Sequence, residues 1–307
     1  MFTSSHSGRR GLRAGMRLEA LDDRLVPATF GYDTATDTMS IAGTVWADTI
    51  TVIDHGDGRV TASDETGTPF TFGDVDRLYV TTFGGDDVVR YKLDGVVERD
   101  LEVDVELGGD DDRFTGTLNR DIAESERLTV TVYGGGGDDL ITLYGTPTAP
   151  ARAGDWLTNG LTINAGGLKI GTGAALIARL DGGDGGDRVY ADYQGELNGT
   201  LHVVALGGGG ADIVSALVRL QAGSWGQVGS GVLSPSVVSG GTGSDDLTFH
   251  AFDESGNARP VLATIHGGET ARTPSEPDRG SRTQNVAHAG GVDSCDIALA
   301  GDSINNN

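Results

Sequence analysis

The sequence predicts an all-β fold: a parallel β-helix or β-roll-like solenoid with coils of about 25 residues and Gly-Asp turns on one edge. Two observations lead to this prediction. An acidic, glycine-rich octet recurs along most of the chain, and apolar residues alternate with period two on both sides of it. Helical periodicity is absent, and 50 glycines in 307 residues oppose helix formation.

The best copy of the octet is Gly134 to Ile141, with the sequence GGGGDDLI. It fits the repeat pattern G-G-x-G-x-D-x-U, in which U is a bulky apolar residue, at every fixed position. Three further segments fit the whole pattern and two fit part of it: Gly182 to Val189, Gly207 to Val214 and Gly240 to Leu247, then Gly84 to Asp87 and Gly108 to Asp112. Four full matches make chance an insufficient explanation in a chain rich in Gly and Asp.

The aspartate that closes each turn fixes the phase of the flanking strands, and we call it the anchor aspartate. The anchors are Asp48, Asp87, Asp112, Asp139, Asp187, Asp212 and Asp245. Counting back from Asp139 by 11, 9 and 7 residues gives Leu128, Val130 and Val132, and counting forward by two gives Ile141. Nearly all equivalent positions around the other anchors are apolar. Each unit is therefore predicted to be a strand, a Gly-Asp turn and a second strand, each strand with one buried face.

The spacing of the anchors predicts how the units stack. From Asp87 onward the spacings are 25, 27, 48, 25 and 33 residues. The 48-residue interval is interpreted as two units, one of which has lost its acidic turn around Leu161 to Ile170. The segment from Met39 to Val52 keeps the phase with a single Asp and is expected to be a less acidic first coil. An antiparallel sandwich with the turns as hairpins is the alternative, because Gly-Gly and Asp-Gly also favour hairpins.

Composition restricts the partners. The formal net charge is -23, and Lys92 and Lys169 are the only lysines, which argues against nucleic acid or an anionic membrane and favours cations. The single cysteine, Cys295, excludes an intrachain disulfide. No run of about 18 apolar residues is present, so no membrane-spanning helix is expected.

Three segments are expected: a targeting segment at 1–29, a solenoid at 30–266 and a disordered tail at 267–307. The tail lacks aromatic residues and any period-two pattern. The first segment lacks the apolar core of an ordinary signal peptide. It resembles the motif L-E-x-L-E-D-R-x-V-P-A found at the start of many planctomycete extracellular proteins, which implies an extracellular or cell-surface location. The matching residues are Leu18, Glu19, Leu21, Asp23, Arg24, Val26, Pro27 and Ala28.

The turns resemble those of the repeats-in-toxin (hemolysin-type) family, in which calcium lies between stacked turns and is held by the motif aspartate and loop carbonyls. That resemblance implies calcium as the cofactor here. This chain departs from the family in carrying one acidic turn per unit instead of tandem nonapeptides. The expected metal ligands are Asp86, Asp87, Asp110, Asp111, Asp112, Asp138, Asp139, Asp184, Asp187, Asp212, Asp245 and Asp246.

A purely structural explanation is that Asp closes each turn through side-chain to backbone hydrogen bonds, for which one Asp per turn suffices. The chain instead carries doublets and a triplet, at Asp138-Asp139 and Asp110-Asp111-Asp112 for example. Turns stacked about 4.8 Å apart would place like charges side by side. Each such pair repels by roughly 3 kcal/mol at an effective dielectric constant of 20. Bound cations would reverse that sign, so folding is expected to be coupled to calcium.

A polysaccharide lyase or hydrolase is the alternative function, since parallel β-helices can present Asp pairs as acid and base. The acidic residues repeat once per unit, and His55, His202, His250 and His266 fall in different units. His202 and His250 occupy outward positions in the phase, which is typical of surface residues. No Gly-x-Ser-x-Gly, His-Glu-x-x-His or phosphate-loop motif is present. The sequence therefore favours a non-catalytic calcium-binding protein with a structural or adhesive role, whose further partners would be extracellular matrix, glycans or a cell-surface molecule.

Overall fold

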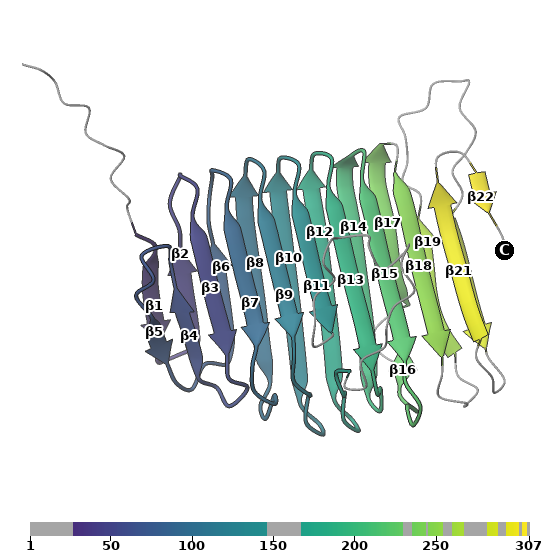
Figure 1. Ribbon diagram of the computed structural model, residues 1–307, viewed down its shortest axis with the longest axis horizontal. Helices are drawn as coiled ribbons and strands as arrows, with labels where there is room; N and C mark the ends of the chain where they lie inside the picture. Colours follow the sequence, from purple (N-terminus) through teal and green to yellow (C-terminus); the bar gives the residue numbers. More distant parts are fainter. Residues whose placement is uncertain are drawn as a thin grey trace, which may run out of the picture.

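The chain forms two β-sheets that both extend along its length, one in front of the other in Figure 1, in a computed structural model. The structure describes residues 27–145, 167–229, 235–243, 245–253, 260–266, 281–287, 293–300 and 303–305. Every regular element in these residues is a strand, so the prediction of an all-β fold is confirmed. Each sheet has 11 strands, and parallel and antiparallel pairings occur in both.

Sheet A comprises β1 (Thr29–Asp33), β2 (Thr38–Ala42), β6 (Arg77–Thr81), β8 (Leu101–Gly109), β10 (Arg127–Gly136), β12 (Ala175–Asp184), β14 (Thr200–Gly210), β16 (Gln227–Val228), β17 (Ser236–Gly243), β19 (Pro260–His266) and β20 (Ser281–Ala287). Sheet B comprises β3 (Thr49–Asp54), β4 (Val60–Ser63), β5 (Phe70–Phe72), β7 (Val88–Leu93), β9 (Arg113–Leu118), β11 (Leu140–Gly145), β13 (Arg188–Gly195), β15 (Ile213–Leu220), β18 (Asp246–Asp253), β21 (Asp293–Ala300) and β22 (Ser303–Asn305).

From β6 to β15 the chain alternates strictly between the two sheets, and each strand pairs in parallel with its equivalent in the next unit. Leu128 in β10 lies opposite Leu101 in β8 on one side and Leu176 in β12 on the other. In sheet B, Ile141 lies likewise between Phe114 and Val189. Each Gly-Asp turn therefore joins a strand of sheet A to a strand of sheet B. The alternative in which the turns are hairpins within one sheet is wrong.

The predicted phase of the strands is confirmed. Val130, Val132 and Ile141 are fully buried around Asp139, and the residues between them on β10 are less buried. The equivalent residues of the other units are also buried: Leu78, Val80, Val89, Leu101, Val103, Val105, Phe114, Leu176, Ala178, Leu180, Val189, Leu201, Val203, Ala205, Val214 and Leu247. Apolar side chains of both sheets thus form one core between the sheets, as period-two alternation requires.

The 48-residue interval between Asp139 and Asp187 is one unit, so its interpretation as two units is wrong. β10 pairs directly with β12, and β11 pairs directly with β13. The extra length falls between Gly145 and Gly167, in 146–166, which lies outside the described residues. Of the region predicted to form a separate unit, Leu161 to Ile170, the described residues add only Ile170 to a ladder that its neighbours form.

That ladder closes the edge opposite the Gly-Asp turns. Single bridges join Val97 to Ile122, Ile122 to Ile170, and Ile170 to Leu197, and all four side chains are buried. Each lies between the end of a sheet B strand and the start of the next sheet A strand. The unit is therefore fixed at three places: one strand in each sheet and one bridge between them.

The N-terminal end adds antiparallel strands to the parallel array. β2 and β3, from the segment expected to begin the array, pair in parallel with β6 and β7, while β1 pairs antiparallel with β2 and β4 with β3. Aromatic rings of β1 and β5 then stack across the two sheets, Phe30 on Phe70 at 4.5 Å and Tyr32 on Phe72 at 5.5 Å between centroids. These stacks cover the end of the core.

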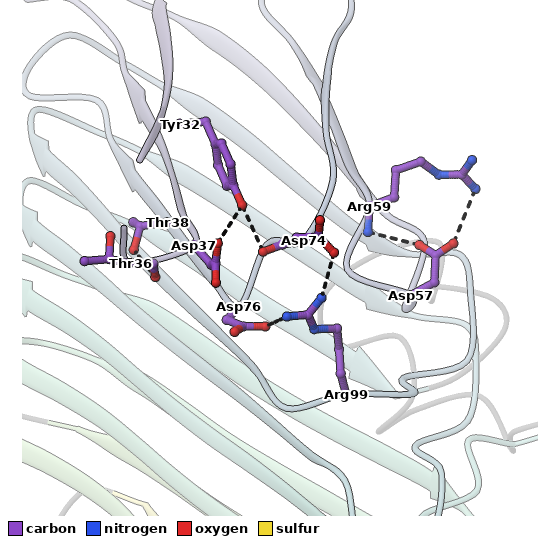
Figure 2. A network of polar contacts seen from close by, with 9 residues as sticks. All are labelled: Tyr32, Thr36, Asp37, Thr38, Asp57, Arg59, Asp74, Asp76 and Arg99. Atoms are coloured by element: carbon purple, nitrogen blue, oxygen red, sulfur yellow. Dashed lines mark hydrogen bonds and ion pairs between the residues drawn. The ribbon is translucent and has the colours of Figure 1, made fainter. Parts of the chain in front are cut away.

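Polar contacts hold the loops at this end together (Figure 2). The Tyr32 hydroxyl lies 3.0 Å from both Asp37 Oδ1 and the Asp74 carbonyl oxygen. Arg99 then pairs with Asp74 at 3.6 Å and with Asp76. Asp37 and Asp74 both have positive φ, a conformation that Asp tolerates in turns. The network ties β1 and the loop before β6 to the loop that follows β7.

The predicted division into three segments stays a prediction. Most of the targeting segment, 1–26, lies outside the described residues. Within 267–307, for which the sequence predicts disorder, the described residues form β20, β21 and β22, which pair antiparallel. No helix of the described residues is long and apolar enough to cross a membrane.

Deleting 146–166 should leave both sheets intact. The deletion shortens the 48-residue interval to 27 residues, the spacing that already separates Asp112 from Asp139, so Ile170 keeps its place beside Ile122. We expect a far-ultraviolet circular dichroism spectrum of unchanged shape and a single cooperative melt. Loss of the β signal in the deletion variant would show that the extra residues are part of the repeat.

Candidate metal centre

The Gly-Asp turns lie in a row along one edge of the molecule, the upper edge in Figure 1. Each turn leaves the carboxyl end of a sheet A strand and enters a sheet B strand, and the parallel register aligns equivalent positions. Gly135, for example, lies opposite Gly108 in one neighbouring turn and Gly183 in the other. Equivalent aspartates are therefore stacked, as the sequence predicts.

The anchor aspartates form a continuous buried row, which we call the inner ladder. None of these residues is more than 7% exposed. The backbone N–H of each anchor donates to Oδ1 of the anchor in the next unit: Asp48 to Asp87 at 2.6 Å, Asp87 to Asp112 at 2.7 Å, Asp112 to Asp139 at 2.8 Å, Asp139 to Asp187 at 2.8 Å, Asp187 to Asp212 at 2.9 Å, and Asp212 to Asp245 at 3.1 Å. One carboxylate oxygen per unit thus satisfies a buried backbone donor.

A second row runs beside the first in the opposite direction, and we call it the outer ladder. The N–H of Asp111 donates back to Asp86 Oδ1 at 3.3 Å, and that of Asp138 to Asp111 Oδ1 at 2.9 Å. Gly186 N–H donates to Asp138 Oδ1 at 2.7 Å and ends the row, because Gly186 has no carboxylate. Adjacent turns with a doublet are therefore joined by two hydrogen bonds of opposite direction. The second Asp of a doublet thus has a structural role as well.

The inner ladder leaves one oxygen of each central carboxylate without a partner. Oδ2 is buried and accepts no hydrogen bond in Asp87, Asp112, Asp139, Asp187 and Asp212. In Asp48, by contrast, Oδ2 accepts the N–H of Thr44 at 2.5 Å. Leaving a charged oxygen buried and unpaired is costly, so it needs a proton or a cation.

The pKa values of the inner ladder reflect the burial of these unpaired oxygens. Burial raises the pKa of Asp112 and Asp187 to about 7 and that of Asp87 and Asp139 to about 6, and neighbouring carboxylates add to the effect. Burial also raises the pKa of Asp212. Without a bound cation, the row is therefore only partly ionised near neutral pH.

Calcium fits this row in the type of its donors. Calcium binds oxygen ligands, six to eight of them, from carboxylates and backbone carbonyls. Each central turn offers an unpaired Oδ2, and beside it lies a carbonyl of the next unit: a Cβ added to Gly134 would overlap both Asp139 Oδ2 and the Gly182 carbonyl oxygen. The described residues include no compact group of three or more Asp, Glu, His or Cys side chains around one point. Carbonyl oxygens would therefore have to complete any calcium site.

The fixed glycines stand at positions one, two and four of the octet, and each makes close packing possible at a different contact. The first, such as Gly134, leaves room for the anchor's own Oδ2. The second and fourth, such as Gly135 and Gly137, have positive φ, and a Cβ there would overlap a carbonyl oxygen of the preceding turn. The third, Gly136, has open space around it. The spacing G-G-x-G-x-D is thus what close stacking of these turns requires.

The predicted ligands fall into distinct places. The inner ladder contains Asp87, Asp112, Asp139, Asp187, Asp212 and Asp245, and the exposed face of the turns contains Asp86, Asp110, Asp111, Asp138 and Asp184. Asp246 belongs to neither group, because it opens β18 opposite Ile213 with an exposed side chain. Asp48 was not among the predicted ligands, although it begins the inner ladder. The strand phase identifies it as an anchor, since Ile50 follows at the same offset, but its turn has a single Asp and no Gly pair.

Sequence reasoning also missed Asp192, on the outer face of sheet B. Its side chain is 7% exposed, burial raises its pKa to about 7, and its Oδ1 has no hydrogen-bond partner. It lies opposite Tyr144 and Leu217 in the register. The expectation of a surface His202 was wrong as well: this outward residue of sheet A is 8% exposed. Alternation with period two predicts on which face of the sheet a side chain lies. It does not predict which residues cover the outer face.

Gly134→Ala should destabilise the protein by roughly 1–3 kcal/mol, because the added methyl group displaces the Asp139 carboxylate and the neighbouring carbonyl. Gly136→Ala is the matched control, since nothing lies within 4 Å of its Cβ position. Urea denaturation of both variants measures the difference. Equal stability of the two variants would contradict the close packing at the first position.

The metal-free protein should lose stability as pH rises from about 4 to about 7. The folded state raises the pKa of the inner aspartates, so it binds more protons than the unfolded state throughout this range. The stabilisation is complete below the unfolded pKa and is lost as pH rises through the folded values. Thermal melts in chelator at pH 5 and pH 8 measure it. A higher melting temperature at pH 8 would contradict the buried, unpaired state of Oδ2.

Comparisons with known proteins add no constraint on this site. No family model matches the chain, and no match is found among curated proteins or solved structures. The resemblance to repeats-in-toxin turns therefore stays a prediction. The chemistry of the site rests on its own geometry.

Proposed function

We propose that the chain is a parallel β-solenoid that binds calcium along its acidic edge and serves a structural or adhesive role outside the cell. The proposal includes no catalytic activity. One observation carries it: five buried aspartates, one per turn, each keep an unpaired Oδ2 in a continuous row.

The alternation between sheets supports the solenoid. A chain that returns to the same sheet after every unit, always in parallel register, winds in one direction about a common axis. The bridge ladder at the opposite edge supports the same path, because Val97, Ile122, Ile170 and Leu197 recur at the same point of successive units. Each unit then buries its apolar face only by stacking on its neighbours.

Charge along the acidic edge supports a divalent cation. Two unit charges about 5 Å apart repel by roughly 3 kcal/mol at an effective dielectric constant of 20, and the row repeats that contact at every step. Burial and, to a lesser degree, the neighbouring carboxylates raise the pKa of Asp112 and Asp187 to about 7, which supports a need for positive charge along this row. Calcium would neutralise the charge at Oδ2, for which the protein supplies no hydrogen-bond donor. The inner aspartates would hold it through Oδ2, while Oδ1 keeps its bond to the neighbouring backbone.

An extracellular setting agrees with this proposal. Calcium is abundant outside cells, where modules of millimolar to submillimolar affinity remain loaded. The resemblance of residues 18–28 to the planctomycete export motif points the same way. A rigid, acidic rod stabilised by calcium suits a spacer or an adhesive element that presents its outer faces to matrix, glycans or a cell surface.

Asp139→Asn should lower the melting temperature in calcium but not in chelator. The amide keeps an oxygen that can accept the Asp112 N–H but removes the charge at Oδ2. In chelator the variant should melt at the same temperature as the parent or a few degrees higher, because repulsion falls. In millimolar calcium it should melt lower than the parent, because a ligand is lost. Circular dichroism melts during a calcium titration measure both.

Asp246→Asn is the matched control, because it removes the same charge outside both ladders. We expect it to follow the parent in both conditions. A melting temperature of the parent protein that calcium does not change would refute the coupling of folding to the metal. A response equally strong with magnesium would contradict calcium selectivity.

A polysaccharide-acting enzyme is the second candidate, and Asp192 is the observation in its favour. A carboxyl group with a pKa near 7 can give or accept a proton, and Asp192 combines that property with neighbouring Tyr144 on a sheet face. Incubation with neutral and acidic polysaccharides, followed by a reducing-end assay, tests it. Cleavage that Asp192→Asn abolishes would overturn the non-catalytic proposal, and no cleavage by the parent would remove this candidate.

A further inference from the structure

Three large apolar side chains are exposed on the first two turns of the acidic edge, and we call them the apolar tip. Val45 is 69% exposed, Trp46 68% and Phe83 54%. The two turns lie side by side, because Gly43 N–H donates to the Thr81 carbonyl oxygen at 2.8 Å. A Cβ on Gly85 would also overlap the backbone of Trp46. The apolar tip therefore exposes two aromatic side chains, Trp46 and Phe83, on neighbouring turns, and exposed apolar patches mark interaction sites.

Phe83 occupies a position at which the fold prefers glycine. Its φ is +75°, and it aligns with Gly108 through the bridge between Gly84 and Gly109. The equivalent residues of the following turns are all glycines with positive φ: Gly108, Gly135, Gly183, Gly208 and Gly241. A bulky side chain at positive φ is strained, and such strain persists where the side chain serves a function.

Exposed carboxylates lie on one side of the apolar tip, in its second turn and in the turn that follows. Asp86 lies in the same turn as Phe83, and Asp110 and Asp111 lie in the next turn. None of the three forms an ion pair with Lys or Arg among the described residues. Aromatic faces flanked by carboxylates attract a cation that carries an apolar stem, and arginine is the side chain that best combines the two.

We propose that the apolar tip and its carboxylates bind an arginine-bearing peptide segment of a partner protein. Charge complementarity selects this occupant: a protein with net charge -23 repels a second copy of itself, and it also repels nucleic acid and anionic lipid. Three side chains are also far fewer than the roughly 800 Å² per partner of a stable protein interface. A short peptide in which arginine side chains lie over Trp46 and Phe83 matches the size and the charge. The proposal does not depend on calcium binding.

Isothermal titration calorimetry tests the proposal, with a synthetic peptide containing two arginines separated by one leucine, in chelator and at low salt. We expect saturable binding that weakens as salt is added. Trp46→Ala and Phe83→Gly should each weaken it by about tenfold. Trp225→Ala is the matched control: Trp225 is 57% exposed but lies outside the Gly-Asp turns, so the variant should bind as the parent does.

Phe83→Gly gives a second readout that a purely structural role would not give. Glycine relieves the strain at φ +75°, so the melting temperature should stay the same or rise by about 2 °C while peptide binding falls. A clear drop in melting temperature would overturn the functional reading of Phe83. Equal binding of a peptide with citrulline in place of arginine would overturn the role of charge.

Two further outcomes would assign the apolar tip to another occupant and so overturn the proposal. One is self-association of the parent protein in sedimentation velocity experiments that Trp46→Ala abolishes, which would identify a second copy. The other is a large gain in peptide affinity when residues 1–26 are deleted, which would identify the chain's own N-terminal segment. We expect a monomer and an unchanged affinity instead.

Discussion

The structure depends on one repeated hydrogen bond, from the backbone N–H of an anchor aspartate to Oδ1 of the anchor in the next unit. It occurs six times, from Asp48 to Asp245, with N···O distances between 2.6 and 3.1 Å. At each turn the chain leaves one sheet for the other, so the anchor's N–H has no strand partner there. The next carboxylate supplies one, and the turns consequently stay in register with the two sheets. As a consequence, a row of carboxyl groups is buried along this edge.

That row links stability and chemistry. Oδ1 is used by the fold, but Oδ2 of the central anchors stays buried and unpaired, which raises their pKa values toward neutrality. Protons and the proposed calcium ions would therefore compete for the same oxygens. The outer ladder is different, because Asp86, Asp111 and Asp138 are exposed to solvent and accept backbone N–H groups in the reverse direction. A doublet of aspartates thus combines a buried acid under strain with an exposed one that mainly positions the turn.

The ends of the array are built differently from its middle. At the N-terminal end, Phe30 and Tyr32 stack on Phe70 and Phe72 and close the core with aromatic rings in place of another turn. The second turn also carries Phe83 where the later turns have glycines of positive φ. Departures from the repeat therefore lie near the end of the array, where the stacked turns restrict side-chain size least. In the middle of the array, a Cβ at the equivalent glycines would overlap the backbone of a neighbouring turn.

The sequence by itself determined the strands, their buried faces and the positions of the turns. Period-two alternation around Asp112, Asp139 and Asp212 can be read from neighbouring residues alone. A shift of a strand by one residue would turn all its apolar side chains outward, so the sequence specifies the buried face. Only the tertiary structure decided which units are neighbours. A 48-residue interval is compatible with two units or with one unit that contains extra residues. The direct pairing of β10 with β12 shows that it is one unit. Burial of Asp192 and the unpaired Oδ2 of each anchor were likewise beyond the sequence, because both depend on atoms far apart in the chain.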